Sequence, residues 1–315
     1  MIFERLLGHR LVIVTGKGGV GKSTVGLSLA LAAREAGKRV LFAEVDSPLE
    51  AVRLLDVGPV GPTETEVRPG LHALNLEPAR AMEEYVRRSL KLEMLARRVL
   101  DSPIYQRFFA AAPGLKELTV LGKVMEIEER RGRRGRAYDL IVLDAPATGH
   151  GLSLLKVPLA AASAIRVGPI GGQARRLLEL LRDTRRTALV VVSTPEEMAV
   201  VEALELRDLA GAEIGIRVEA MVMNACHERR LTKRQEAELA RLEADRPSGR
   251  LEPGVPVRAA VAAARRHLAR VARSHGYASR LRRESRVPVI ALPFVHRAPL
   301  DEPALRELAT RLARQ

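Results

Sequence analysis

The sequence predicts an α/β fold in which helices flank a doubly wound, mostly parallel sheet and a helical subdomain is attached. Short apolar runs alternate with longer segments of helical periodicity, which is typical of this fold class. The runs are continuously apolar rather than alternating, as expected for strands covered on both faces. Glycine-rich or acidic residues follow several runs, at the sheet edge where such folds bind ligands.

The apolar runs place the strands of this sheet. We expect strands at residues 11–14, 39–45, 71–76, 140–144, 187–193, 218–223 and 287–292. Residues 47–70 are rich in Pro, Gly, Thr and Glu, and therefore predict a loop. The arginine-rich residues 130–136 predict a solvated turn, with docking of an acidic partner as the alternative.

Helical periodicity fills the intervals between the strands. We expect helices over residues 22–36, 194–209, 230–246, 256–284 and 300–315, and over 79–131 with breaks near Pro103 and at Pro113-Gly114. Thr194 is expected to be an N-cap, because Pro195 and Glu197 follow it. Residues 168–172 predict a mobile connection. Since no Pro/Ser/Gly-rich linker divides the chain, residues 1–315 predict a single domain with a helical insertion at approximately 79–131.

A glycine-rich loop follows the first strand. It fits the P-loop pattern, with Gly16, four residues and then Gly21-Lys22-Ser23, between a strand and a helix. Its backbone amides would surround phosphate oxygens, Lys22 would reach the β- and γ-phosphates, and the Ser23 hydroxyl would bind Mg²⁺. The expected nucleotide-binding residues are Gly16, Lys17, Gly18, Gly19, Val20, Gly21, Lys22, Ser23 and Thr24.

The same loop also contains a weaker pattern, the dinucleotide-binding fingerprint Gly16-x-Gly18-x-x-Gly21. Glu44 or Asp46, at the end of the next strand, would then hold a ribose. The Lys-Ser pair favours the P-loop, so the dinucleotide site stays the less favoured alternative.

Acidic residues end two of the expected strands. Four apolar residues precede Asp144, which is typical of the Walker B carboxylate that faces the metal of a nucleotide site. Asp46 follows the strand at residues 39–45. The alternative is that Asp144 only caps a turn. We expect Ser23, Asp46 and Asp144 around Mg²⁺, the carboxylates acting directly or through water.

The full loop sequence GKGGVGKST resembles the deviant P-loop of the ArsA, ParA/MinD and nitrogenase-iron-protein ATPases, in which an additional lysine crosses a dimer interface. Lys17 occupies that position. The segment Asp144-Ala-Pro-Ala-Thr-Gly-His150 resembles switch II of the ArsA/Get family, with its proline displaced by one residue. Asp46-Ser47-Pro48 resembles the family's switch I without its histidine. The chain as a whole resembles the bacterial single-domain ArsA-like type.

This resemblance implies a Mg²⁺-dependent ATPase that hydrolyses ATP to ADP and phosphate in a dimer, formed with a second copy or with a paralogue. Lys17, Lys22 and Asp46 would be catalytic, with Lys17 acting on the partner's nucleotide and Asp46 orienting water. The switch residues would be Asp144, Thr148, Gly149 and His150. The resemblance also places adenine against Asn224, Pro293 and Phe294.

The purpose of such an ATPase has three alternatives. The resemblance favours the handling or targeting of a protein client. In such targeting ATPases the region that corresponds to the apolar residues 152–167 helps to build a client groove, but here we favour packing in the core or at the dimer interface, with the groove as the alternative. A ParA/MinD-like positioning switch is the second, and an arsenite or anion pump subunit is the third. A single cysteine, Cys226, excludes a Cys-x-x-Cys site within the chain, so we expect no zinc or metalloid site.

The charge balance is strongly basic. The formal net charge is +14, and only eight of the 52 basic residues are lysine. Biased codon usage explains this excess of arginine, and an acidic partner, an anionic membrane or a nucleic acid is the alternative. With no Trp, four Tyr and five Phe, we consider nucleic acid an unlikely partner. No signal peptide or bilayer-spanning run is visible, so a cytoplasmic location is expected.

Overall fold

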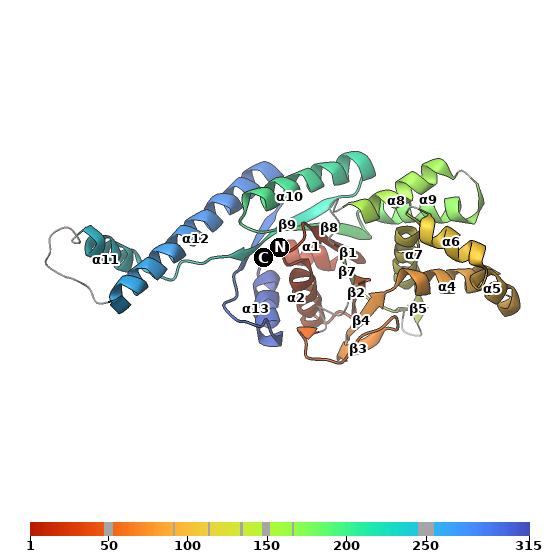
Figure 1. The fold of residues 1–315 in the computed structure, drawn as a ribbon, viewed down its shortest axis with the longest axis horizontal. Helices are drawn as coiled ribbons and strands as arrows, with labels where there is room; N and C mark the ends of the chain where they lie inside the picture. Colours follow the sequence, from red (N-terminus) through yellow and green to blue (C-terminus); the bar gives the residue numbers. More distant parts are fainter. Residues whose placement is uncertain are drawn as a thin grey trace.

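The computed structural model describes residues 1–46, 53–90, 92–112, 114–132, 135–146, 152–165, 167–244 and 255–315. An eight-stranded sheet has the order β10-β9-β8-β1-β7-β2-β4-β3 (Figure 1). Its strands are β1 (Leu11–Gly16), β2 (Val40–Val45), β3 (Thr65–Arg68), β4 (Leu71–Leu76), β7 (Leu140–Asp144), β8 (Thr187–Ser193), β9 (Val218–Cys226) and β10 (Val289–Pro293). Neighbouring strands are parallel except for β3 and β4. The predicted doubly wound, mostly parallel α/β sheet is confirmed.

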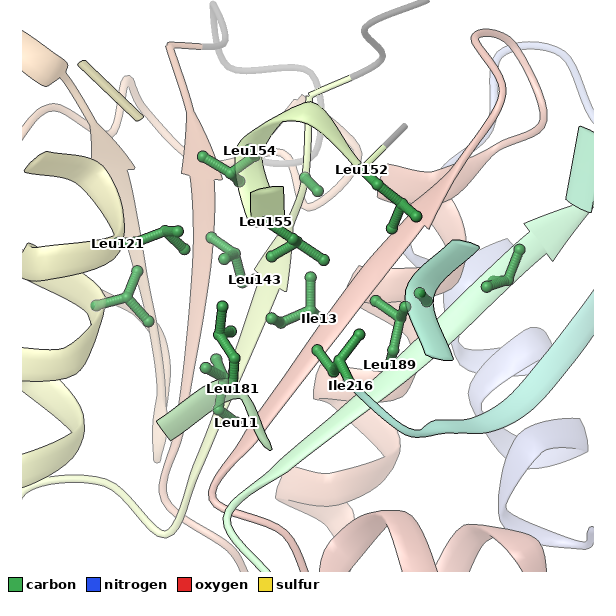
Figure 2. Close-up of a cluster of buried hydrophobic side chains, with 14 of the residues drawn as sticks. Leu11, Ile13, Leu121, Leu143, Leu152, Leu154, Leu155, Leu181, Leu189 and Ile216 are labelled. Atoms are coloured by element: carbon green, nitrogen blue, oxygen red, sulfur yellow. The ribbon is translucent and has the colours of Figure 1, made fainter. Parts of the chain in front are cut away.

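Two hydrophobic cores cover the two faces of the sheet, which explains why its strands are apolar at every position. In β1, Leu11 and Ile13 join one core, whereas Val12 and Val14 join the other. The first core is closed by α7 (Leu115–Glu129), α8 (Ser153–Ala164), α9 (Gly168–Arg182) and α10 (Glu197–Leu209). Figure 2 shows Leu155 beside Ile13 and Leu181 beside Leu11, both of β1, in this core. The second core is closed by α1 (Ile2–Leu7), α2 (Lys22–Glu35) and α13 (Glu302–Ala313).

The segment predicted to be a helical insertion consists of four helices. They are α4 (Pro78–Leu90), α5 (Glu93–Leu100), α6 (Pro103–Ala111) and α7. Met82, Val86 and Ala96 form a small core of their own there. Only α7 also packs into the core of the sheet, so α4, α5 and α6 lie to one side of it (Figure 1).

A long helix, α12 (Val255–Ser285), follows α11 (Lys233–Ala244) near the end of the chain. The second half of α12 packs on the body of the protein, because Val271, Ala278 and Leu281 are buried. Its first half and α11 project away from the sheet (Figure 1).

Several local predictions are wrong. The expected loop at residues 47–70 contains β3, whose only buried residue, Val67, left too short a pattern to detect. Thr194 is not an N-cap, since α10 begins at Glu197 after the N-cap Glu196. This helical region continues as a π-helix over Ala210–Ile214 and ends at the left-handed Gly215. Residues 168–172, expected to be a connection, form the first turn of α9.

Two other features concern the arginine run and the membrane. The expected turn at residues 130–136 includes a short hairpin, β5 (Arg131–Gly132) with β6 (Gly135–Arg136). Its flanking residue Arg130 is anchored by an ion pair with Glu64 at 2.5 Å. Among the described helices, none combines the length and the apolar character needed to cross a bilayer.

Candidate functional site

The P-loop connects β1 to α2, and β1 lies between β7 and β8 near the centre of the sheet. Two of its glycines are required because a side chain at either position would clash with neighbouring strands. A Cβ on Gly16 would lie 2.3 Å from the Val192 carbonyl oxygen, and one on Gly21 would lie 2.4 Å from Nδ2 of Asn224. Both glycines also have a positive φ, of 150° and 85°. The loop is thus held tightly against β8 and β9, with α2 starting directly behind it.

Lys22 is the central cation of this loop. Its side chain is buried, and its Nζ donates a hydrogen bond to the Lys17 carbonyl at 3.2 Å. It lines a cavity of about 400 Å³ together with Gly19, Gly21 and Asp144. Burial lowers the pKa of Lys22, and the Asp144 carboxylate opposes that shift. A buried cation at a helix N-terminus beside an open cavity is suited to binding an anion.

Ser23 and Asp144 meet across the same cavity, as expected for a metal-assisted phosphate site. The Ser23 hydroxyl donates a hydrogen bond to Oδ2 of Asp144. The contact follows from the sheet register, in which Val14 of β1 pairs with Asp144 of β7. Among the described side chains, no group of three or more His, Cys, Asp or Glu could hold a metal. Mg²⁺ suits these residues nonetheless, because it keeps several waters and shares phosphate oxygens.

Glu44 is a further carboxylate at this edge, and the P-loop interpretation of the sequence gave it no role. It is buried, lines the same cavity and lies beside Asp144 in the register of β2 and β7. Its position at the end of a buried strand was the available signal. Asp46 follows two residues later, is exposed and does not line that cavity.

A second cavity, of about 300 Å³, adjoins the first and contains the residues expected to hold adenine. Asn224, Pro293 and Phe294 all line it, and Gly19 and Gly21 line both cavities. The buried Asn224 amide donates a hydrogen bond to the Val20 carbonyl at 2.9 Å. Asn224 therefore also fixes the shape of the P-loop.

Lys17 is separated from these two cavities. Its Nζ lies 2.6 Å from Oε1 of Glu202 on α10, and both side chains are about one-third exposed, at 39% and 34%. The sequence gave no indication of this ion pair, because the partners are 185 positions apart. The neighbouring Gly18 is exposed.

Several predicted switch residues cannot be placed. Ser47, Pro48, Thr148, Gly149 and His150 lie outside the described residues. The apolar segment that follows is described in large part, and Leu152, Leu154 and Leu155 pack in the core rather than along a groove.

A cavity of about 610 Å³ lies away from the P-loop, between α4, α7 and α9. Charged side chains in its wall neutralise one another, as Arg88 does with Glu126 and Arg176 with Glu129, each at 2.6 Å. It lacks the combination of a buried cation, a hydroxyl and a carboxylate that the P-loop cavity has. The chemistry therefore belongs to the P-loop edge.

Comparisons with known proteins agree with this site. Residues 9–178 match the family described as anion-transporting ATPase. ATPase BagA of Mycobacterium tuberculosis is 34% identical over 220 residues, which are 68% of this chain and 64% of that protein. A putative arsenical pump-driving ATPase of Halobacterium salinarum is 30% identical over 66% of this chain and 35% of its own length. An arsenical pump-driving ATPase of Escherichia coli is 28% identical over 67% and 38%. The chain thus spans less than two-thirds of the length of these relatives.

Proposed function

Because this chain belongs to the ArsA family of anion-transporting ATPases, we propose that it binds ATP with Mg²⁺ at the P-loop and hydrolyses it to ADP and phosphate. The observation that carries this proposal is the contact between Ser23 and Asp144 beside the buried Lys22. A hydroxyl, a carboxylate and a cation around one cavity are the groups that phosphoryl transfer needs.

Each group has a role that follows from its place. Lys22 and the loop amides would bind the β- and γ-phosphates and neutralise the charge that develops on the leaving group. Ser23 and Asp144 would hold Mg²⁺, which supplies further charge neutralisation. Asp46 would orient the attacking water, since an ordinary carboxylate is a weak base at neutral pH. The exposed Asp46 would have to approach the phosphates when the site closes.

The position of Lys17 supports hydrolysis within a dimer, formed either with a second copy or with a paralogue. Lys17 points to Glu202 on α10 and not into its own phosphate cavity. A lysine on the outer side of the loop can reach a nucleotide held by a facing subunit, and it would act there as an arginine finger does. The ion pair with Glu202 would open when the dimer closes.

The test of this role is Lys17→Ala. We expect nucleotide binding to be retained and hydrolysis to fall by roughly 10³-fold, because a charge supplied in trans acts on the transition state. ATP turnover and the binding of a fluorescent ATP analogue are the measurements. Lys116→Ala, an exposed lysine on α7, is the matched control. Normal turnover of Lys17→Ala would remove this residue from the mechanism.

We also propose that the ATPase cycle handles an apolar protein client. The supporting observation is exposed apolar surface in the helical subdomain, where Leu92, Met94 and Ile104 are 65%, 79% and 80% exposed. Val167, after α8, is 82% exposed. These side chains lie outside the packed cores and are available to a partner.

A peptide that forms a single apolar helix is the probe for this client role. Met94→Gln with Ile104→Gln should weaken its binding several-fold, because each substitution removes apolar contact area. Met198→Gln, on the distant α10, is the control, since Met198 is 60% exposed. Binding is measured by fluorescence anisotropy. Equal binding by the wild type, the double variant and the Met198→Gln control would contradict the client role.

The other two roles have weaker support. Arsenical pump-driving ATPases are among the relatives, yet the only cysteine, Cys226, is buried and its burial raises the pKa of the thiol to about 11. A buried, protonated thiol is a poor metalloid ligand. A positioning switch needs a surface to bind, and the positive charge of α12, described below, is the feature that would serve this role.

A further inference from the structure

The long helix α12 carries an unusual share of the protein's charge. Val255–Ser285 contains eight arginines and a single carboxylate, Glu284, and so has a net charge of +7. The whole chain has a net charge of +14. One helix of 31 residues therefore accounts for half of the excess positive charge.

Several arginines of the helical subdomain are paired with carboxylates. In the helical subdomain, Arg80 pairs with Glu83 and Arg97 with Glu93. On α12, Arg266, Arg270 and Arg273 are exposed, and none has a carboxylate partner among the residues that the structure describes. Biased codon usage would raise the arginine content of both regions, but it does not explain why carboxylates are frequent in the helical subdomain while α12 has only Glu284.

The three arginines lie on one face of the helix. Their spacing of four and then three residues places them on adjacent turns, over about 10 Å of helix. Val271 and Ala278, which help to attach α12 to the body, are buried and lie about 100° around the helix from Arg270. The three arginines lie around the middle of α12, where its projecting first half meets the half that packs on the body (Figure 1).

The chemistry of this surface restricts its partner. We refer to α11 and α12 together as the arm. Neither helix has an exposed large apolar side chain among its described residues, so these residues provide no anchor of the kind that a membrane-bound amphipathic helix uses. A second copy would carry the same positive charge and be repelled. The guanidinium group of arginine binds phosphate oxygens through paired N–H donors. It is also more weakly hydrated than the ammonium group of lysine. The arm is therefore suited to a regular array of phosphates.

We propose that α12 binds the phosphate backbone of a nucleic-acid duplex, without sequence specificity. The scarcity of aromatic residues argues against stacking on the bases of a single strand, but it is no obstacle to backbone binding, which requires only cations. A helix that carries arginines can lie in the major groove, where phosphates flank it on both sides.

The base of this arm touches the nucleotide edge. The backbone N–H of His227, just after β9, donates to Oγ of Ser274 on α12 at 3.0 Å. The His227 ring stacks on Phe294 at 4.7 Å, and Phe294 lines the cavity expected to hold adenine. A bound duplex would therefore alter ATP turnover. Only this coupling rests on the proposed ATPase function, whereas duplex binding does not.

The experiment compares two triple variants with the same change in net charge. One removes the unpaired arginines, Arg266→Gln, Arg270→Gln and Arg273→Gln. Its matched control removes paired, exposed arginines of the helical subdomain, Arg80→Gln, Arg88→Gln and Arg97→Gln. Binding of a fluorescently labelled DNA duplex is measured by anisotropy over a series of salt concentrations, without nucleotide.

We expect the α12 variant to bind at least about tenfold more weakly, and its slope of log affinity against log salt to fall by about three, one for each lost phosphate contact. The control should bind like the wild type. Equal loss in both variants would assign binding to overall charge and overturn the proposal. It would also be overturned by tighter binding of the wild type to poly-glutamate or to phosphatidylglycerol vesicles, or by no duplex binding at low salt.

A final measurement separates this proposal from the proposed function. Without duplex, both triple variants should hydrolyse ATP at the wild-type rate, because none of the six arginines lines the P-loop cavity. If the wild-type protein binds the duplex but does not hydrolyse ATP, the proposed ATPase function is contradicted and the proposal that α12 binds a duplex still stands.

Discussion

The two edges of the sheet use similar charged groups in opposite ways. At the carboxyl edge, the buried Lys22 and Asp144 face a cavity of about 400 Å³. At the amino edge, the side chain of Glu128 is fully buried and forms ion pairs with Arg10, Arg136 and Arg186. Buried charge at the amino edge is thus neutralised by the protein itself, whereas charge at the carboxyl edge is open to a ligand.

The difference has a structural cause. Arg10 precedes β1 and Arg186 precedes β8, so both side chains leave the sheet at the edge where α7 brings Glu128. Arg10 also donates to the carbonyls of Tyr138 and Asp139, at 2.9 and 3.2 Å. These contacts join α7 to the starts of three strands. We infer that the amino edge stabilises the fold and the carboxyl edge carries the function.

The largest effect that would test this division is expected from Lys22→Ala. Its ammonium group neutralises transition-state charge, so we expect ATP turnover to fall by about 10²–10³-fold. The free energy of unfolding should change by less than about 1 kcal/mol, because removal of the group relieves a desolvated charge. Turnover and chemical unfolding are measured on the same preparation. A large loss of stability would show that the carboxyl edge is structural as well.

Glu128→Ala should produce the reverse pattern. It leaves three arginines around an empty buried position, and we expect a loss of about 3–5 kcal/mol in the free energy of unfolding. The adjacent Glu129, with a side chain 39% exposed and paired with Arg176, is the matched control. Glu129→Ala should cost less than about 1 kcal/mol. Equal losses in the two variants would contradict the role given to Glu128.

The smallest effect concerns Cys226, the last residue of β9. It lies at the carboxyl edge, but its thiol is buried, as the Glu128 carboxylate is at the amino edge. Burial raises the pKa of its thiol to about 11. Because only the thiolate reacts, alkylation by iodoacetamide at pH 8 should be roughly 10²-fold slower in the folded than in the unfolded protein, whose thiol has a pKa of about 8.5. The native rate should rise about tenfold per pH unit up to the raised pKa. Rapid alkylation at pH 8 would show that this part of the edge is open.

The sequence predicted the sheet well because each strand is buried on both faces, and a continuously apolar run records that burial locally. It predicted β3 poorly, since an edge strand with one buried residue has almost no pattern. Thr194 also misled, because it has the composition of an N-cap but lies two residues before the N-cap that the structure uses.

For the candidate site, the sequence by itself determined the P-loop and the acidic ends of two strands. These features depend on residues that are consecutive in the chain, and any parallel α/β sheet brings them to one edge. Only the tertiary structure decided which side chains meet there. Lys17 pairs with Glu202, Asn224 holds Val20, and Glu44 joins the cavity. Each contact depends on the order of the strands, which local composition does not encode.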